Sequence, residues 1–144
     1  ILDLKEFNFP LFSERWGRIK EQPAGMAEFV QAIVEADGVI IVTPVYNGSF
    51  AAAAKNAIDI LYAEWRHKPV AIYSGTYTPT PGIAAVQQLQ AIMLKLGALV
   101  APALGTFINM GTELAEDGTP VNPDKFIPMM RPPVDELLWM IDRK

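Results

Sequence analysis

Apolar positions recur with a helical period near the start of the chain. From Met26 they fall at offsets of 0, 3, 4, 7 and 8, which predicts a helix with one buried stripe. A turn signal at residues 35–38 ends this helix, and four consecutive β-branched residues follow at 39–42. An unbroken run of this kind predicts a strand that is buried on both faces.

The same alternation of helix and strand continues along the chain. Short apolar strands are predicted at residues 70–73 and within ALVAPALGTFI, and a last helix is predicted to begin at Pro132 and Pro133. Residues 111–133 show no clear period and are predicted to wrap the surface or a neighbouring subunit. The three further helical stripes comprise Ile58, Leu61, Tyr62 and Trp65, then Val86, Leu89, Met93 and Leu96, then Val134, Leu137, Leu138 and Ile141.

Strict alternation of helix and strand predicts an α/β fold with a mostly parallel sheet and helices on both faces. The length of 144 residues suits a single domain with a substantial core. In such sheets ligands bind beyond the carboxyl ends of the strands. The segments that leave Val42, Tyr73 and Ile108 are therefore the expected binding loops.

Charge and composition exclude several classes of function. The 12 basic and 16 acidic residues give a net charge of -4 without a basic cluster, so no nucleic-acid partner is expected. Cysteine is absent, which excludes thiolate metal sites and fits a reducing compartment, and we expect a cytoplasmic protein. No apolar run approaches the roughly 20 residues of a membrane span, so no membrane partner is expected.

The first expected binding loop is TPVYNGS, residues 43–49. Thr43 and Pro44 are predicted to stop the strand and stiffen the loop. Tyr46 offers a flat ring, Asn47 offers a donor and an acceptor, and Ser49 is a candidate N-cap for the next helix. This set suits a flat heterocycle with polar edges. Ordinary turn chemistry explains the same residues about equally well.

The second expected loop is SGTYTPTPG, residues 74–82, which leads into a helix at Ile83. Free backbone N–H groups at a helix start carry positive partial charge and suit developing negative charge on a ligand. Taken alone this is a weak signal, because many strand-to-helix loops have a similar composition.

Taken together, the two loops resemble a known family. The run ADGVIIVTPVYNGSFAAAAKNAIDIL, residues 36–61, resembles the AD-strand-TPEYN-S-LKNAID segment of the NAD(P)H-dependent FMN reductases, which have the flavodoxin-like fold. The similarity continues through DLKEFNFPLF at 3–12, KPVAIYSG at 68–75 and LKLGALVAP at 94–102. A TPxYN motif followed by KNAID at this spacing is fairly specific.

The resemblance implies a three-layer flavodoxin-like domain that binds FMN and accepts hydride from NADPH or NADH. Electrons would pass to a small-molecule acceptor such as a quinone, an azo compound, a metal oxyanion or free flavin. Because the flavin does the chemistry, no catalytic side chain and no metal site are expected. The residues expected to bind the cofactor are Thr43, Pro44, Val45, Tyr46, Asn47, Ser49, Ser74, Gly75 and Thr76. The amides of residues 74–76 would face the negatively charged edge of the ring.

Family members commonly form homodimers or homotetramers, and the same is expected here. Trp65, Trp139 and the proline-rich segment 111–133 are expected to supply apolar surface for the subunit contact.

Two features depart from the family pattern. Val45 stands where the family usually has glutamate. The family's first strand and its phosphate-binding loop have no counterpart, so residues 1–144 are expected to form one N-terminally incomplete domain. Two other readings stay open at this point: a flavodoxin-type electron carrier, and a flavin-free oligomeric relative without catalysis.

Overall fold

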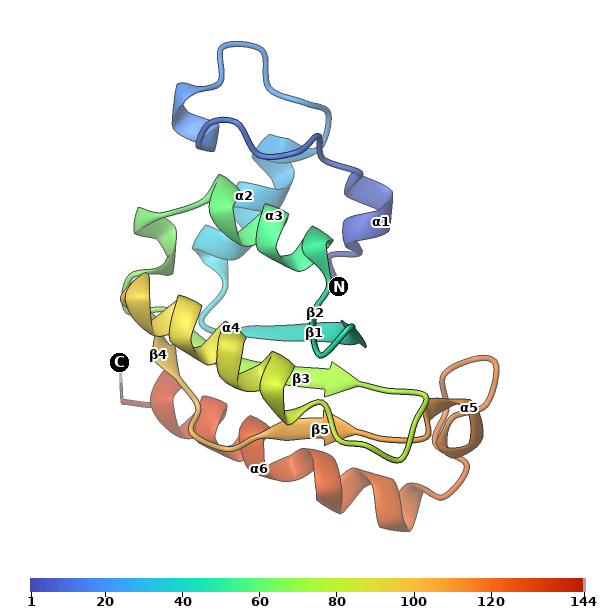
Figure 1. The fold of residues 1–144 in the computed structure, drawn as a ribbon. Helices are drawn as coiled ribbons and strands as arrows, with labels where there is room; N and C mark the ends of the chain where they lie inside the picture. The colour runs from blue at the N-terminus through green and yellow to red at the C-terminus, as the bar shows by residue number, and fades with distance from the viewer. Residues whose placement is uncertain (144) are drawn as a thin grey trace.

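A five-stranded sheet forms the centre of the molecule (Figure 1). The computed structural model describes residues 1–143. Strand β3 (Pro69–Gly75) lies in the middle and pairs in parallel with β1 (Val39–Tyr46) on one edge. On its other edge it pairs in parallel with β4 (Leu99–Val100) and then with β5 (Gly105–Phe107). The short strand β2 (Ser49–Phe50) is antiparallel to the end of β1.

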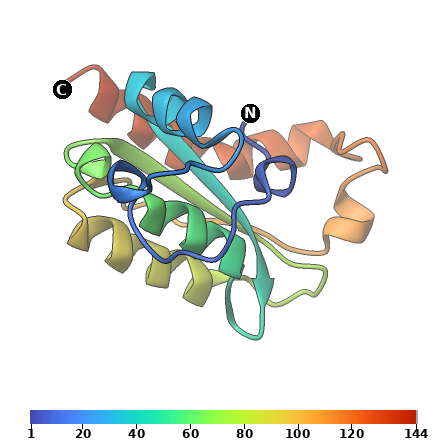
Figure 2. The same ribbon diagram turned by 90° about the horizontal axis from the view of Figure 1, so that it is seen from above.

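Helices cover both faces of this sheet (Figure 2). Helices α3 (Ala52–Ile60) and α4 (Ile83–Lys95) lie on one face. Helix α6 (Pro123–Ile141) lies on the other face. Helix α2 (Met26–Glu35) packs in the same apolar cluster as α3 and α4. The predicted three-layer α/β fold is therefore confirmed. The remaining helical turns are α1 (Leu4–Phe7), α5 (Met110–Glu113), and 3-10 turns at Trp16–Arg18 and Ala63–Trp65.

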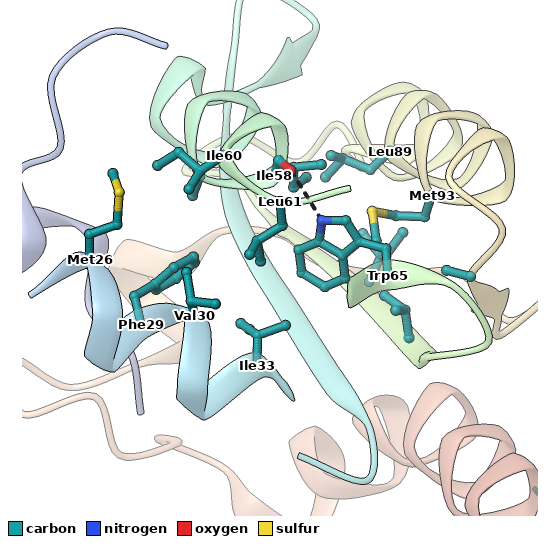
Figure 3. Packing of buried hydrophobic residues seen from close by; sticks show 14 of the residues in the cluster. Met26, Phe29, Val30, Ile33, Ile58, Ile60, Leu61, Trp65, Leu89 and Met93 are labelled. Atoms are coloured by element: carbon teal, nitrogen blue, oxygen red, sulfur yellow. Dashed lines mark hydrogen bonds between the residues drawn. The ribbon is translucent and has the colours of Figure 1, made fainter. Parts of the chain in front are cut away.

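Strand β3 separates two apolar clusters because its side chains alternate between the faces. Val70 and Ile72 belong to the larger cluster, together with buried side chains from α2, α3 and α4 (Figure 3). Ala71 and Tyr73 belong to the smaller cluster with Leu137 of α6. All seven residues of β3 are buried, as expected for a central strand covered by helices on both faces.

The prediction that residues 39–42 form a doubly buried strand is half right. They are part of β1, but Ile40 and Val42 are 46% and 64% exposed. Within residues 1–143, no strand pairs with the edge of β1 opposite β3 before the hairpin to β2 begins. Such an apolar run is typical of a central strand, and over this stretch β1 has a pairing partner on one edge only among the described residues.

Two predicted helices have different limits. Helix α3 ends at Ile60, so Trp65 lies in a separate 3-10 turn, where its indole Nε1 donates to Ile58 O at 3.1 Å (Figure 3). Helix α6 begins at Pro123, about ten residues before the predicted start, because Asn122 accepts a hydrogen bond from Lys125 N and caps it. Much of segment 111–133 is therefore helical, despite its internal prolines. Among residues 1–143 no helix is long and apolar enough to cross a membrane.

Candidate functional site

The motif TPVYNGS forms a β-hairpin where a loop was expected. Asn47 and Gly48 have φ angles of 51° and 77°, which is the geometry of a two-residue type I′ turn. Tyr46 pairs with Ser49 across this turn, and Pro44 stays within β1 opposite Gly75. The prediction that Pro44 ends the strand is wrong. The hairpin extends beyond the carboxyl edge of the sheet, where the ring of Tyr46 is 63% exposed.

Two hydroxyl groups fix this hairpin, and neither is free for a ligand. Thr43 is buried, and its Oγ1 accepts from Ala51 N at 3.0 Å and donates to Pro44 O at 3.0 Å. Ser49 donates from Oγ to Gln88 Oε1 at 2.6 Å. The N-cap of α3 is Ala51, without a side-chain hydrogen bond, so the prediction that Ser49 caps the helix is wrong.

The second loop curls around one threonine hydroxyl. Thr76 Oγ1 lies 2.9 Å from Thr78 O and 3.0 Å from Thr80 O. Both of these carbonyl groups precede prolines, so their peptide units carry no N–H group. Ser74 is also buried, and its Oγ donates to Gly82 O at 2.9 Å. Both hydroxyls shape the loop from inside.

The backbone amides available to a ligand differ from those predicted. Ser74 and Gly75 lie inside β3, between β1 and β5, and Thr76 N donates to Phe107 O at 2.9 Å. Among the described residues, no protein acceptor meets the amides of Tyr77, Thr78 and Thr80. These three donors were missed from the sequence, although the alternation of proline and non-proline residues at 77–81 hints at them.

The hairpin and the second loop touch directly. A Cβ atom on residue 82 would lie 2.5 Å from Val45 Cγ2 and even closer to Ser74 Oγ, so only glycine fits there. Val45 therefore packs one binding segment against the other. The structure brings the two predicted segments into one site.

A third segment closes the other side of the second loop. Met110 N donates to Thr76 O at 3.0 Å, and Asn109 N donates to Thr78 O at 3.2 Å. The ring of Tyr77, which is exposed, lies against Gly111 of α5. The loop that was predicted to leave Ile108 thus supports the site by holding residues 76–78 in place.

An aromatic stack lies below this third segment. The rings of Tyr73, Phe107 and Phe126 are stacked at successive centroid distances of 5.5 Å. The hydroxyl of Tyr73 donates to Met130 O at 2.5 Å and so ties β3 to α6. Burial raises the pKa of Tyr73 above its usual value near 10. These contacts hold the strand from which the second loop leaves.

This site can hold a flat polar ring more readily than it can do acid–base chemistry. Tyr46 supplies an exposed aromatic face, and Asn47 supplies an exposed amide. The backbone of Tyr77, Thr78 and Thr80 supplies free N–H donors. Within residues 1–143 no group of three metal-ligating side chains occurs. None of the nine sequence-predicted residues is charged.

A comparison with protein families decides the assignment. Residues 1–113 match the model of the family described as NADPH-dependent FMN reductase. The chain belongs to the NADPH-dependent FMN reductase family. Membership confirms the predicted family and, at the family level, FMN and a nicotinamide as cofactors.

Several characterised proteins are similar over much of the chain. An NAD(P)H-dependent FMN reductase of Saccharomyces cerevisiae is 34% identical over 83% of this chain and 66% of its own length. An NADPH azoreductase of a Bacillus species is 29% identical over 84% of the chain and 69% of its own length. A quinone reductase of Escherichia coli is 33% identical over 65% of the chain and 52% of its own length.

Solved structures show the same fold. The flavoenzyme FerB, an NAD(P)H:(acceptor) oxidoreductase of Paracoccus denitrificans, superimposes with a TM-score of 0.73 at 22% identity. The alignment covers 92% of this chain and 75% of FerB. The chain spans 66%, 53% and 35% of the lengths of three fungal FMN reductases that it matches.

The residues of this site fit the ring of FMN. Tyr46 and Asn47 would contact one side of the ring system, and the amides of Tyr77, Thr78 and Thr80 suit the carbonyl oxygens of its polar edge. The nine sequence-predicted residues include both exposed side chains and side chains that are held by protein partners. The side chains of Tyr46 and Asn47 are exposed, whereas the hydroxyls of Thr43, Ser74 and Thr76 have protein partners.

Proposed function

We propose that this protein is an NAD(P)H-dependent FMN oxidoreductase that reduces small acceptors such as quinones and azo compounds. The observation that carries the proposal is the family match combined with an uncharged hairpin and loop at the carboxyl edge of the sheet. The names of the Bacillus azoreductase and the Escherichia coli quinone reductase support these two acceptor classes.

Bound FMN would supply the redox chemistry by accepting a hydride and releasing electrons to the acceptor. The residues of this chain bind the flavin ring and orient it. Tyr46 and Asn47 fix the plane of the ring, and the three free amides of the second loop stabilise negative charge at its polar edge. The packing of Val45 against Gly82 fixes the position of the hairpin relative to the second loop.

The protein is proposed to act as a homodimer or homotetramer in the cytoplasm. Helix α6 carries an exposed apolar set that suits a subunit contact, comprising Ile127, Met129, Leu138 and Trp139. Trp65, which was expected to contribute, is only 2% exposed and belongs to the core. The cysteine-free composition supports a reducing compartment.

Steady-state oxidation of NADPH and NADH in the presence of FMN tests the proposal. We expect turnover with a benzoquinone and with an azo dye, measured as loss of nicotinamide absorbance. The Tyr46→Ala and Asn47→Ala variants should lose turnover, whereas Tyr62→Ala, at an exposed tyrosine away from the hairpin, should retain it. Flavin binding without turnover would instead indicate an electron carrier, and absence of flavin binding would indicate a non-catalytic relative.

A further inference from the structure

One side chain of helix α4 reaches the hairpin. Gln88 is exposed on α4, and its Oε1 accepts a hydrogen bond from Ser49 Oγ at 2.6 Å. The two residues lie 39 positions apart in the sequence, and α4 is the helix into which the second loop leads (Figure 1). This bond therefore joins the hairpin to the helix that follows the other half of the candidate site.

Ser49 lies directly opposite Tyr46 in the hairpin. The two residues pair across the turn that Asn47 and Gly48 form. The side chains of directly opposed residues lie on the same face of an antiparallel pair, with Cβ atoms about 5 Å apart. The hydroxyl group that Gln88 holds is therefore a neighbour of the exposed ring of Tyr46.

The opposite face of the hairpin is held by apolar packing. Val45 and Phe50 form the next pair along the two strands, so their side chains point to that face. Val45 lies against Gly82, and Phe50 packs against the larger apolar cluster. These contacts fix the base of the hairpin but do not reach the side chains on the other face.

The face with Tyr46 has a polar anchor instead. Among the described residues, the bond to Gln88 is the only side-chain hydrogen bond from residues 46–49 to another element. Strand β2 comprises only two residues, and a two-stranded ribbon of this size is not stable by itself. The orientation of this face therefore depends on the bond to α4.

We propose that Gln88 is a positioning residue that holds the ring of Tyr46 in place through Ser49. The amide of Gln88 fixes the Ser49 hydroxyl, and the pairing of Ser49 with Tyr46 then sets the direction in which the ring points. The inference rests on the proposed function for its ligand, whereas the hold on the hairpin is measurable without flavin.

Replacement of the Gln88 amide tests this role. Gln88→Met keeps the length of the side chain and removes the strong acceptor, whereas Gln88→Glu keeps an acceptor for the Ser49 hydroxyl. Gln87→Met is the matched control, because Gln87 is exposed on the same helix and its side chain makes no hydrogen bond among the described residues. Two quantities are measured on the chain Ile1–Lys144: hydrogen exchange of the amides of residues 46–50 without flavin, and riboflavin affinity by fluorescence titration.

We expect Gln88→Met to speed exchange in the hairpin and to weaken riboflavin binding, each by about two- to tenfold, the usual net effect of one hydrogen bond. Gln88→Glu should keep both quantities near the wild-type values, and Gln87→Met should change neither. Adding Ser49→Ala to Gln88→Met should cause no further loss, because both substitutions remove the same bond.

Unchanged exchange in Gln88→Met would show that Gln88 does not hold the hairpin. Faster exchange with wild-type affinity for riboflavin, or equally weak binding by Gln88→Glu, would show that this bond does not position Tyr46. Additive losses in the double variant would mean that Gln88 does not act through Ser49. A wild type that binds no riboflavin would contradict the proposed function instead, and the exchange measurement would still decide whether Gln88 holds the hairpin.

Discussion

Val45 and Gly82 hold the two halves of the candidate site together. A methyl group on residue 82 would lie 2.5 Å from Val45 Cγ2, which is closer than real Cβ contacts. The Gly82→Ala variant should therefore push the hairpin and the second loop apart. We expect a loss of about 1–3 kcal/mol in the free energy of unfolding, measured with urea, and weaker flavin binding.

Two further variants separate this clash from a general effect of alanine. Gly17→Ala has no atom near its new methyl group and should change neither quantity. Adding Val45→Ala to Gly82→Ala removes one of the two clashing groups, so part of the lost stability should return. A double variant no better than Gly82→Ala would mean that Val45 is not the group in contact.

Thr76 should control flavin binding through loop shape. Thr76→Val removes the hydroxyl that faces the carbonyls of Thr78 and Thr80, so the free amides of the loop lose their fixed directions. We expect flavin affinity to fall several-fold and stability to fall by about 1–3 kcal/mol, measured by flavin titration and urea unfolding.

Thr76→Ser keeps this hydroxyl and should preserve both properties. Thr112→Val removes an exposed hydroxyl that donates to Asn109 O at 3.1 Å, and serves as the control for replacing threonine by valine. If Thr76→Val lost stability but bound flavin unchanged, the loop shape would not matter for the ligand.

Ionisation of Tyr73 should lower the stability of the fold at alkaline pH. Burial raises its pKa in the folded state above the unfolded value near 10. The neutral hydroxyl therefore stabilises the fold fully below pH 10, and this contribution is lost as the pH rises through the folded pKa. Urea unfolding at increasing pH should show a steeper alkaline decline in the wild type than in Tyr73→Phe.

The same Tyr73→Phe variant should be about 1 kcal/mol less stable at neutral pH, because Met130 O loses a donor. Tyr77→Phe, at an exposed ring, is the control and should change neither quantity. An alkaline decline of equal slope in Tyr73→Phe and the wild type would contradict this role.

Periodicity and β-branched runs sufficed to predict α2, β3 and α4, because these elements pack against a continuous core. The sequence did not reveal how the site is built. Asn47–Gly48 is a strong hairpin signal, yet Pro44 and Ser49 directed the interpretation to a loop and a helix cap. The start of α6 was missed because Pro132 and Pro133 were taken as the beginning of the helix, whereas the helix is capped at Asn122.

The partners of buried hydroxyls could not be predicted either, since they depend on distant segments. Thr76 meets Phe107 and Met110 across more than thirty residues of sequence. Sequence reasoning therefore listed Thr43, Ser74 and Thr76 among the binding residues, but it could not show that their hydroxyls are held by protein partners.

The candidate site predicts little discrimination between FMN and riboflavin by the chain Ile1–Lys144. The exposed groups, Tyr46, Asn47 and the amides of Tyr77, Thr78 and Thr80, all suit the ring, and none carries a charge for the phosphate. Titration of both ligands into a sample of verified mass should give affinities within a few-fold. A strong preference for FMN in that sample would show a phosphate site elsewhere in these residues.

The most direct test of the flavin site is a fluorescence titration of riboflavin with the wild type and with Tyr46→Ala, Asn47→Ala and Tyr62→Ala. Stacking on Tyr46 should quench the flavin, and loss of an aromatic platform costs about 1–3 kcal/mol, or roughly tenfold or more in affinity. We predict weaker binding in the first two variants and wild-type binding in Tyr62→Ala. Wild-type affinity and quenching in both Tyr46→Ala and Asn47→Ala would contradict the site proposed for the flavin ring.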